Sequence, residues 1–304
     1  MHYSDIIKLQ QLPGVGRKSI LRLIKELMSN GPSSLGFEDF LHILSEKMNR
    51  KFLVSELEKI QIGTEKILEN CYNENIAIIT CLDDDFPKNL NHIDGDSPVL
   101  LYYKGNKSLL AYNSNIAVIG TRYPSIEGFK KAKAYSELIT SQGVVVVSGL
   151  AKGCDTAAHL GAIKYKEKSI AVIPSGIGCV YPIENKQLYD SILNRDGCIV
   201  SEYEPYTPPQ SYTFIERDRI QAALSAGLLI IESSIAGGTN HTYNYGLKYG
   251  KQIAASNHES FGSNNMSLNR KILRDAKGFA IQSKKDIEIW LDILNKEVWD
   301  ETNH

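Results

Sequence analysis

The sequence predicts an α/β fold built around an open parallel sheet, with a helical domain in front of it. The first observation behind this prediction is a set of short apolar runs, at 116–119, 144–147, 169–173 and 228–231. None of them alternates with polar residues, which is typical of parallel strands that are covered on both faces. The second observation is that segments of helix length separate the runs. Strand–helix alternation of this kind places a ligand crevice at the carboxyl ends of the strands.

The third observation is that a Gly-rich loop follows each run, at 120–122, 148–153, 174–178 and 236–239. These loops fall where backbone N–H groups and helix N-termini favour anions. Arg122 adds a planar, permanently charged fork that suits phosphate. The alternative for Arg122 is that it only pairs with a surface carboxylate.

The first part of the chain is predicted to be a helical domain. A length of 304 residues is enough for two domains. Apolar residues follow helical spacing from 9 to 27, and further helices are predicted at 36–48 and 52–70. We therefore expect a helical domain over residues 1–72 and an α/β domain over residues 73–304.

A break in the first helical segment resembles the hairpin of a helix-hairpin-helix motif, as found in SAM-like helical domains. It reads Pro-Gly-Val-Gly-Arg-Lys at 13–18. Gly14 and Gly16 leave the backbone N–H groups accessible to a phosphate, and Arg17 and Lys18 add charge. Base-excision glycosylases share a very similar string, but the catalytic Asp or Lys that they need downstream is not identifiable here. The alternative is a corner between two helices, in which the glycines only make the turn.

Between these regions, strands are predicted at 76–80 and 98–105, and a linker at 106–115 leads into the main domain. A helix is predicted at 125–142, and the tail at 268–294 is predicted as helix, short strand and helix.

Later helices are predicted to begin near Asp155, Asn185, Phe214 and Asn240. Asp155 and Asn185 are expected to cap their helices, because their side chains can accept from the N–H groups of the first turn. His159, one turn after Asp155, is expected to be a core histidine.

Composition limits the class of function. Lys and Arg number 34 against 35 Asp and Glu, so nucleic-acid binding requires a local basic patch. The five cysteines are odd in number and lack C-x-x-C spacing, which predicts no zinc site, no disulfide framework and a reducing cytoplasm. No run is long enough to cross a membrane, and we expect no signal peptide. Cys154 lies in a Gly-rich loop near a helix start, where a thiol pKa can fall, but no Cys–His arrangement accompanies it.

Two arginines, Arg217 and Arg219, lie near the predicted start of a helix beside the crevice. At least one of them is expected to face it.

Several of these motifs occur together in a fixed order along the chain. They are Gly120-Thr121-Arg122, the run from Ser148 to Asp155 with Ala158-His159, Tyr181-Pro182 with Asn185, Ser201-Glu202-Tyr203, Phe214 with Arg217 and Arg219, and Gly237-Gly238-Thr239 with Thr242. In this order and spacing they resemble the DNA-processing protein A (DprA/Smf) family, over most of residues 5–275. The resemblance implies an extended Rossmann-like fold that binds single-stranded DNA, acts as a dimer and loads the recombinase RecA in natural transformation. It implies neither catalysis nor a cofactor.

The expected site follows from the resemblance and from the residue types. The residues expected to bind DNA phosphates are Gly120, Thr121, Arg122, Ser148, Gly149, Lys152, Gly153, Phe214, Arg217, Arg219, Gly237, Gly238 and Thr239. Tyr123, Tyr203 and Phe214 are candidates for stacking on bases, which tolerates any sequence. Binding is therefore expected to favour single strands over duplex and to lack base specificity.

The sequence departs from the family pattern at three points. Arg217-Asp218-Arg219 stands where the family usually has Arg-Asn-Arg, and a carboxylate repels phosphate. The loop at 236–242 differs from the commoner Ser-Gly-Ser-Leu-Ile-Thr. We also expect no counterpart of the family's C-terminal winged helix. These departures leave open a relative with a drifted role, such as phage defence or sensing of a nucleotide.

An enzymatic alternative is a LOG-type nucleotide phosphoribohydrolase, a class that shares Gly-Gly-x-Gly-Thr loops. Such enzymes need an acidic residue shortly after that loop. Asn240, His241 and Thr242 stand there instead, which argues against hydrolysis.

Overall fold

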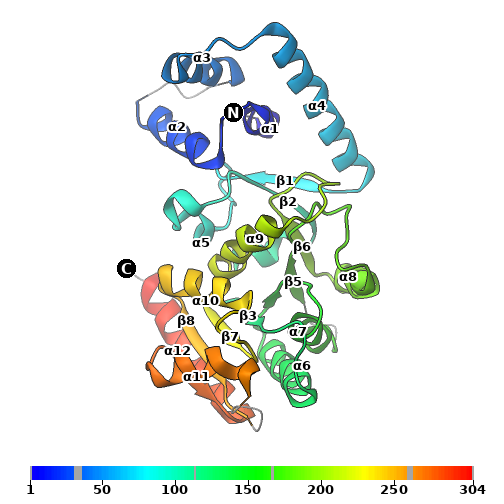
Figure 1. Cartoon of the computed structure of the whole chain (residues 1–304), viewed down its shortest axis with the longest axis vertical. Coiled ribbons are helices and arrows are strands. Elements are labelled where there is room, and N and C mark those ends of the chain that lie inside the picture. The colour runs from blue at the N-terminus through cyan, green and yellow to red at the C-terminus, as the bar shows by residue number, and fades with distance from the viewer. Residues whose placement is uncertain (1, 31–35, 113, 166–167, 259–262, 303–304) are drawn as a thin grey trace.

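The computed structural model describes residues 2–30, 36–112, 114–165, 168–258 and 263–302 (Figure 1). At its centre is a nine-stranded sheet in the order β1-β2-β6-β5-β4-β3-β7-β8-β9. The strands are β1 (Ala77–Thr80), β2 (Leu100–Gly105), β3 (Ile116–Ile119), β4 (Val146–Ser148), β5 (Ser169–Val172), β6 (Cys198–Ser201), β7 (Gly227–Ile230), β8 (Gln252–Ser256) and β9 (Phe279–Ile281). Strands β3 to β9 pair in parallel, and β2 pairs antiparallel with both β1 and β6. The predicted α/β fold with a parallel sheet is confirmed.

Helices cover both faces of the sheet, which explains why its strands are apolar throughout. One face carries α6 (Ile126–Ser141), α7 (Cys154–Ala162), α8 (Lys186–Asn194) and α12 (Lys284–Thr302). The other carries α5 (Lys88–Asn91), α9 (Ser211–Ala223), α10 (Thr239–Lys248) and α11 (Ser267–Arg274). Fully burying one Val, Leu or Ile side chain contributes roughly 1.5–3 kcal/mol, and buried residues of this kind fill both layers.

The order of the strands reverses at β3. The chain runs outward from β3 through β4, β5 and β6, and then returns to place β7 on the other side of β3. In open α/β sheets a reversal of this kind leaves a crevice at the carboxyl ends of the strands.

Four helices form a layer against the β1–β2 edge of the sheet (Figure 1). They are α1 (Tyr3–Gln11), α2 (Arg17–Asn30), α3 (Phe37–Met48) and α4 (Val54–Asn73). Their apolar side chains share one hydrophobic cluster with Leu100 and Tyr102 of β2. Because the helices end at Asn73 and the first strand begins at Ala77, we propose that the domain boundary lies between them, close to the predicted 72/73.

The hairpin between α1 and α2 uses its arginine inside the molecule. The Arg17 guanidinium donates to the backbone carbonyls of Asp96 and Ser97, and its Nη2 lies 3.5 Å from Oε2 of Glu216. Gly14, with φ +81°, makes the turn. Of the two charges that the motif was expected to offer to phosphate, that of Arg17 instead joins the helical layer to the α/β part, and Lys18 is exposed.

Some predicted boundaries shift for local reasons. Strand β4 begins at Val146, two residues after the predicted start, and ends at Ser148, whose hydroxyl donates to the Val118 carbonyl at 2.7 Å. Helix α9 begins at Ser211, before Phe214, because Thr213 accepts from the backbone N–H of Gln210 in a capping box.

Short 3-10 helices occupy several connections. They are η1 (Asp94–Asp96), η2 (Lys107–Ala111), η3 (Ile183–Asn185) and η5 (Asn264–Met266). The expected linker at 106–115 is therefore partly ordered by η2, where Leu109 and Leu110 are buried.

Candidate nucleic-acid interface

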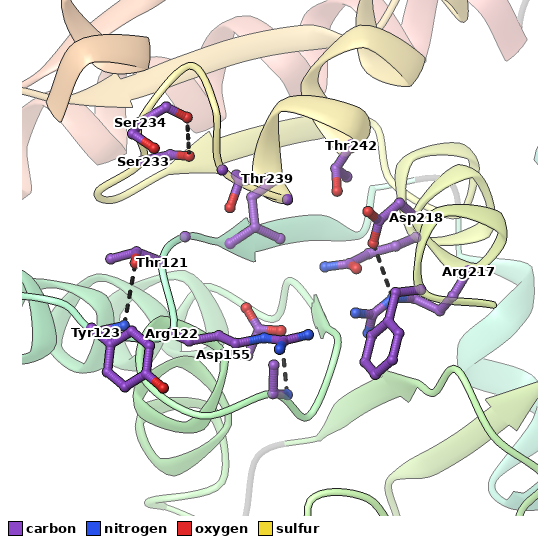
Figure 2. Close-up of a pocket in the computed structure, with 17 residues that line it drawn as sticks. Thr121, Arg122, Tyr123, Asp155, Arg217, Asp218, Ser233, Ser234, Thr239 and Thr242 are labelled. Carbon is purple, nitrogen blue, oxygen red and sulfur yellow. Dashed lines mark hydrogen bonds and ion pairs between the residues drawn. The ribbon is translucent and has the colours of Figure 1, made fainter. Parts of the chain in front are cut away.

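A pocket of about 400 Å³ opens at the carboxyl end of β3, where the order of the strands reverses (Figure 2). Its walls come from the loops after β3 and β7 and from helices α7, α9 and α10. The lining residues are Ile119, Gly120, Thr121, Arg122, Tyr123, Ala151, Asp155, Phe214, Arg217, Asp218, Gln221, Ser233, Ser234, Gly237, Gly238, Thr239 and Thr242. Eight of the thirteen predicted phosphate-binding residues therefore lie around one cavity.

The mouth of the pocket is cationic and aromatic. Arg122, Tyr123 and Phe214 line it, and Tyr181 packs against Phe214 beside it; we call these four residues the rim. The Arg122 guanidinium lies 5.0 Å from the centroid of the Phe214 ring. The edge of Tyr181 meets the same ring, with centroids 5.7 Å apart. Tyr123 is 80% exposed and Tyr181 is 41% exposed. Within the described part of the chain, no carboxylate forms an ion pair with Arg122, so its charge is available to a ligand.

The loop that carries Arg122 is held from behind by Glu232. The backbone N–H of Thr121 donates to the Glu232 carbonyl at 2.7 Å, and the N–H of Ser125 donates to its carboxylate at 2.8 Å. Gly120 is required at the turn, because a Cβ there would lie 2.5 Å from Sγ of Cys154. The direction of the Arg122 loop is thus fixed by backbone bonds and by close packing.

The N-terminus of α10 forms the wall opposite Arg122. Gly237, Gly238 and Thr239 lie at this end of the helix, and Figure 2 shows Thr239 and Thr242 beside the cavity. The first N–H groups of a helix lack partners within the helix and favour anions. In α10 the N–H groups of Asn240 and His241 already donate to the carbonyls of Gly237 and Gly238. What this wall offers a phosphate oxygen is therefore the dipole of the helix and the N–H groups before Asn240.

The floor of the pocket, which we define as Asp155, Arg217, Asp218 and Gln221, is buried. Nη1 of Arg217 donates to the carbonyls of Gly149 and Val172, both at 2.7 Å. Its Nε donates to Oδ1 of Asp218 at 3.0 Å. A Cβ at Gly149 would lie 1.9 Å from Nη1 of Arg217, so any residue other than glycine at this position would clash with the guanidinium. The expectation that at least one of the two arginines faces the crevice is confirmed by Arg217.

Two carboxylates flank Arg217. Burial raises the pKa of Asp218 to about 6, although the Arg217 charge opposes the shift. Burial also raises the pKa of Asp155 above its ordinary value, again against the Arg217 charge. The prediction that Asp155 caps its helix is wrong: Gly153 occupies the cap position, and the carboxylate accepts from the N–H of Ala151 at 3.4 Å. Asp155 belongs to the pocket because the loop after β4 folds over it.

Gln221 was not predicted from the sequence. Its side chain is 2% exposed, lines the pocket, and its Nε2 has no hydrogen-bond partner among the described residues. It lies four residues after Arg217 on α9 and hence on the same face of the helix. That spacing was the signal available in the sequence, and the three-residue spacing of Thr239 and Thr242 on α10 was a similar one.

Arg219 was predicted to bind phosphate, but the structure places it elsewhere. Its side chain is 1% exposed, and its Nη2 donates to both carboxylate oxygens of Glu202 at 2.6 Å. Its Nε lies 3.4 Å from Glu216. This arginine is structural, because its charge is already neutralised inside the protein.

The other predicted residues outside the cavity divide into buried and exposed groups. Ser148 and Gly149 are buried beneath the floor. Gly153 is held at the Arg122 loop, where a Cβ would lie 2.5 Å from the Thr121 carbonyl oxygen. Lys152 is exposed, and its Nζ is 2.6 Å from Oε1 of Glu184. Tyr203 is half-buried and does not line the pocket.

Three further side chains were assigned roles from the sequence. Asn185 occupies the N-cap position of α8 as predicted, but its side chain makes no capping bond. Its amide donates instead to the Leu150 carbonyl at 2.8 Å and to Thr156 at 2.9 Å, and so fastens the loop after β4. His159 is a core histidine, because burial lowers its pKa to about 3 and its ring bonds to Ser169. Burial raises the pKa of the Cys154 thiol rather than lowering it.

A model of the DNA recombination-mediator protein A family matches residues 77–290, and this range contains the whole pocket. The chain belongs to this family. The DprA relatives include the DNA processing protein DprA of Streptococcus pneumoniae, 40% identical over 57% of this chain and 60% of the relative. DprA of Bacillus subtilis is 30% identical over 70% of this chain and 71% of the relative. The matches to the pneumococcal protein and to the Smf protein of Synechocystis thus span about three fifths of those relatives' length.

Solved DprA structures share the fold. The crystal structure of DprA from Streptococcus pneumoniae superposes with a TM-score of 0.80 at 27% identity, covering 95% of this chain and 98% of that one. A structure of Helicobacter pylori DprA, described by its single-stranded DNA binding mode, superposes with a TM-score of 0.63 at 25% identity, covering 73% of this chain and 96% of that one. The Rossmann-like fold with a helical layer is therefore that of the DprA family.

Within the described ranges, no helix has the length and apolarity needed to cross a membrane. In the same ranges, no group of three or more His, Cys, Asp or Glu side chains is placed to hold a metal ion.

Proposed function

We propose that this protein binds single-stranded DNA across the pocket, with the phosphates at the rim, and acts as a recombination mediator. The observation that carries the proposal is the rim itself. Arg122 is an exposed arginine without an ion-pair partner among the described residues, and it lies over an aromatic ring at the mouth of the pocket. A ligand with both negative charge and flat apolar surfaces fits this combination, and a single strand of DNA has both.

The arrangement favours a single strand over a duplex. Base stacking on an aromatic side chain requires an unpaired base and is worth about 1–3 kcal/mol per base. Phe214, Tyr181 and Tyr123 are placed to supply such surfaces around Arg122. A charge-assisted bond from Arg122 to a phosphate adds roughly 1.5–3 kcal/mol.

The comparisons support the same ligand. The Helicobacter pylori relative is described as a single-stranded DNA-binding DprA, and the family model carries the description of a recombination mediator. On this basis we also propose a homodimer, loading of RecA in natural transformation, a cytoplasmic location and a role without catalysis. These finer points rest on family membership.

A nucleotide ligand is the second candidate, because one observation favours it. The pocket of about 400 Å³ ends in a buried floor that includes two carboxylates, which suits a single polar molecule as well as a strand. A phosphoribohydrolase is a weaker candidate, since Asn240, His241 and Thr242 follow the Gly-Gly loop in place of an acidic residue.

Fluorescence anisotropy of labelled oligo-dT, with unlabelled duplex and free nucleotides as competitors, tests the proposal. We expect oligo-dT to bind more tightly than duplex, and its affinity to fall as salt rises because bound phosphates release counterions. If free nucleotides displace the labelled oligo-dT at a lower concentration than unlabelled oligo-dT does, the protein is instead a nucleotide sensor. No binding of oligo-dT at low salt would contradict the proposed function.

A further inference from the structure

A buried histidine, His258, lies between two carboxylates outside the pocket. It follows β8, and its side chain is 0% exposed. Its Nε2 lies 3.3 Å from Oε1 of Glu232, and its Nδ1 lies 3.3 Å from Oε2 of Glu127. Neither nitrogen has a hydrogen-bond partner of regular geometry among the described residues. The ring therefore joins three segments that are distant in sequence: the ends of β7 and β8, and the first turn of α6.

Of the two carboxylates, that of Glu232 is the one sealed from water. Its side chain is 1% exposed, and a Cβ at Gly128 in the first turn of α6 would lie 2.4 Å from its Oε1. A carboxylate buried in this way costs free energy unless it is hydrogen-bonded and its charge is compensated. The N–H and the hydroxyl of Ser125 supply hydrogen bonds, but a helix N-terminus supplies only about half a unit of positive charge.

The remaining charge compensation for Glu232 comes from His258. No lysine or arginine of the described residues forms an ion pair with this carboxylate, whereas His258 does. Glu127 differs, since its side chain is 30% exposed and Nζ of Lys131 lies 3.9 Å from its Oε1. A neutral imidazole has one N–H and can donate to one carboxylate, whereas an imidazolium can donate to both. The two carboxylates thus favour the charged form of the ring.

We propose that His258 is a positioning residue for DNA binding: its charge holds Glu232 in place, and Glu232 holds the loop that presents Arg122 to the strand. The Glu232 carbonyl accepts from the N–H of Thr121, which precedes Arg122. The Glu232 carboxylate accepts from the N–H of Ser125, which follows it. One residue therefore fixes both sides of the loop. This inference rests on the proposed binding of single-stranded DNA and adds a residue that does not line the pocket.

The test measures oligo-dT affinity by fluorescence anisotropy in His258→Gln, which keeps a polar side chain but cannot carry a charge. We expect binding about three- to fivefold weaker than in the wild type, because Arg122 keeps its charge but loses part of its preorganisation. In an Arg122→Ala background the same substitution should have no further effect, since it acts through that arginine. The matched control is His42→Gln on α3, where the histidine is 75% exposed and also lies beside a glutamate. The control should change neither binding nor melting temperature.

The double variant His258→Gln/Glu232→Gln tests whether the effect comes from charge. It removes the buried carboxylate together with its partner, and the new amide oxygen can still accept from the N–H of Ser125. Removing one partner of a buried pair is costly, whereas replacing both partners is close to neutral. We therefore expect His258→Gln alone to lower the melting temperature, and the double variant to recover both the melting temperature and the oligo-dT affinity.

Three results would overturn the positioning role while leaving the proposed function intact. They are a folded His258→Gln that binds as the wild type does, an equal loss of affinity in the Arg122→Ala background, and no recovery in the double variant. Absence of oligo-dT binding by the wild type would overturn the proposed function itself. The melting temperatures then still decide whether His258 compensates Glu232, because independent residues would give additive losses of stability.

Discussion

Arg122, in the loop after β3, and Arg219, on α9, are two arginines that the sequence predicts to do the same work and that the structure treats in opposite ways. Arg122 is exposed at the pocket mouth, over the ring of Phe214, with no ion pair among the described residues. Arg219 lies within the interior, where Glu202 and Glu216 neutralise it and 1% of its side chain is exposed. The comparison teaches that a cation is available to a ligand where the fold leaves its charge unpaired, whatever motif it belongs to.

Replacing Arg219 should have the largest effect, and it should act on stability. In Arg219→Met, Glu202 keeps a charge on a side chain that is 11% exposed and loses its main partner. Breaking a buried pair from one side costs about 3–5 kcal/mol, which urea unfolding measures. Affinity of the folded fraction for oligo-dT should stay within about twofold of the wild type. A variant of normal stability with tenfold weaker binding would place Arg219 in the site and erase the contrast.

Replacing Arg122 should have the next largest effect, and it should act on binding. Arg122→Ala removes one charge-assisted contact of roughly 1.5–3 kcal/mol, so oligo-dT affinity should fall at least about tenfold with an unchanged melting temperature. The matched control is Arg274→Ala on α11, whose side chain is 76% exposed and does not line the pocket. A loss of similar size in the control would mean that net charge rather than the rim governs binding.

Asp218→Asn should have the opposite effect to Arg122→Ala, because it removes a negative charge from the pocket. We expect it to tighten oligo-dT binding several-fold at low salt. The carboxylate repels phosphates at the rim, and salt screens that repulsion. Because burial raises the pKa of Asp218 to about 6, oligo-dT affinity of the wild type should rise as the pH falls through that value and the carboxyl loses its charge.

The pKa of Asp218 also depends on the charges of its neighbours Arg217, Asp155 and His241. The Asp218→Asn variant is needed because it shows how much of the pH dependence of binding comes from Asp218 itself. In Asp218→Asn the part of the pH dependence centred near 6 should vanish. Weaker oligo-dT binding in the variant at every pH would show that the carboxylate assists the strand instead.

Replacing Lys152 should have the smallest effect. Its ammonium is already paired with Glu184 at 2.6 Å on an exposed surface, and a strand must compete with that carboxylate. Lys152→Ala should therefore weaken oligo-dT binding only about two- to threefold. Glu184→Gln, which releases the ammonium, should tighten binding by a similar factor. A tenfold loss in Lys152→Ala would move the lysine into the rim.

The parallel sheet and its loops could be predicted because they depend on local patterns. Apolar runs without alternation, such as 116–119, require cover on both faces, and the Gly-rich loops follow them at one edge. The fate of charged side chains could not be predicted in the same way, because it depends on partners that are distant in sequence. Arg17 binds carbonyls near Ser97, some 80 residues away, and pairs with Glu216.

Some misassigned side chains did carry a usable signal. Residues two apart on a helix point in different directions, so Arg217 and Arg219 could not both face one crevice. The same geometry places Gln221 beneath Arg217. Asp155 and Asn185 carried no such signal, because the loop after β4, which they both bind, is brought to them only by the folded sheet.

The salt dependence of oligo-dT binding, measured for the wild type and Arg122→Ala between about 50 and 200 mM salt, tests most directly whether phosphates bind at the rim. For a single strand, each neutralised phosphate adds about 0.7 to the slope of log affinity against log salt. We predict that Arg122→Ala binds more weakly and that its slope is shallower by about 0.7. Equal slopes for the two proteins, with or without a loss of affinity, would contradict the placement of a phosphate at Arg122.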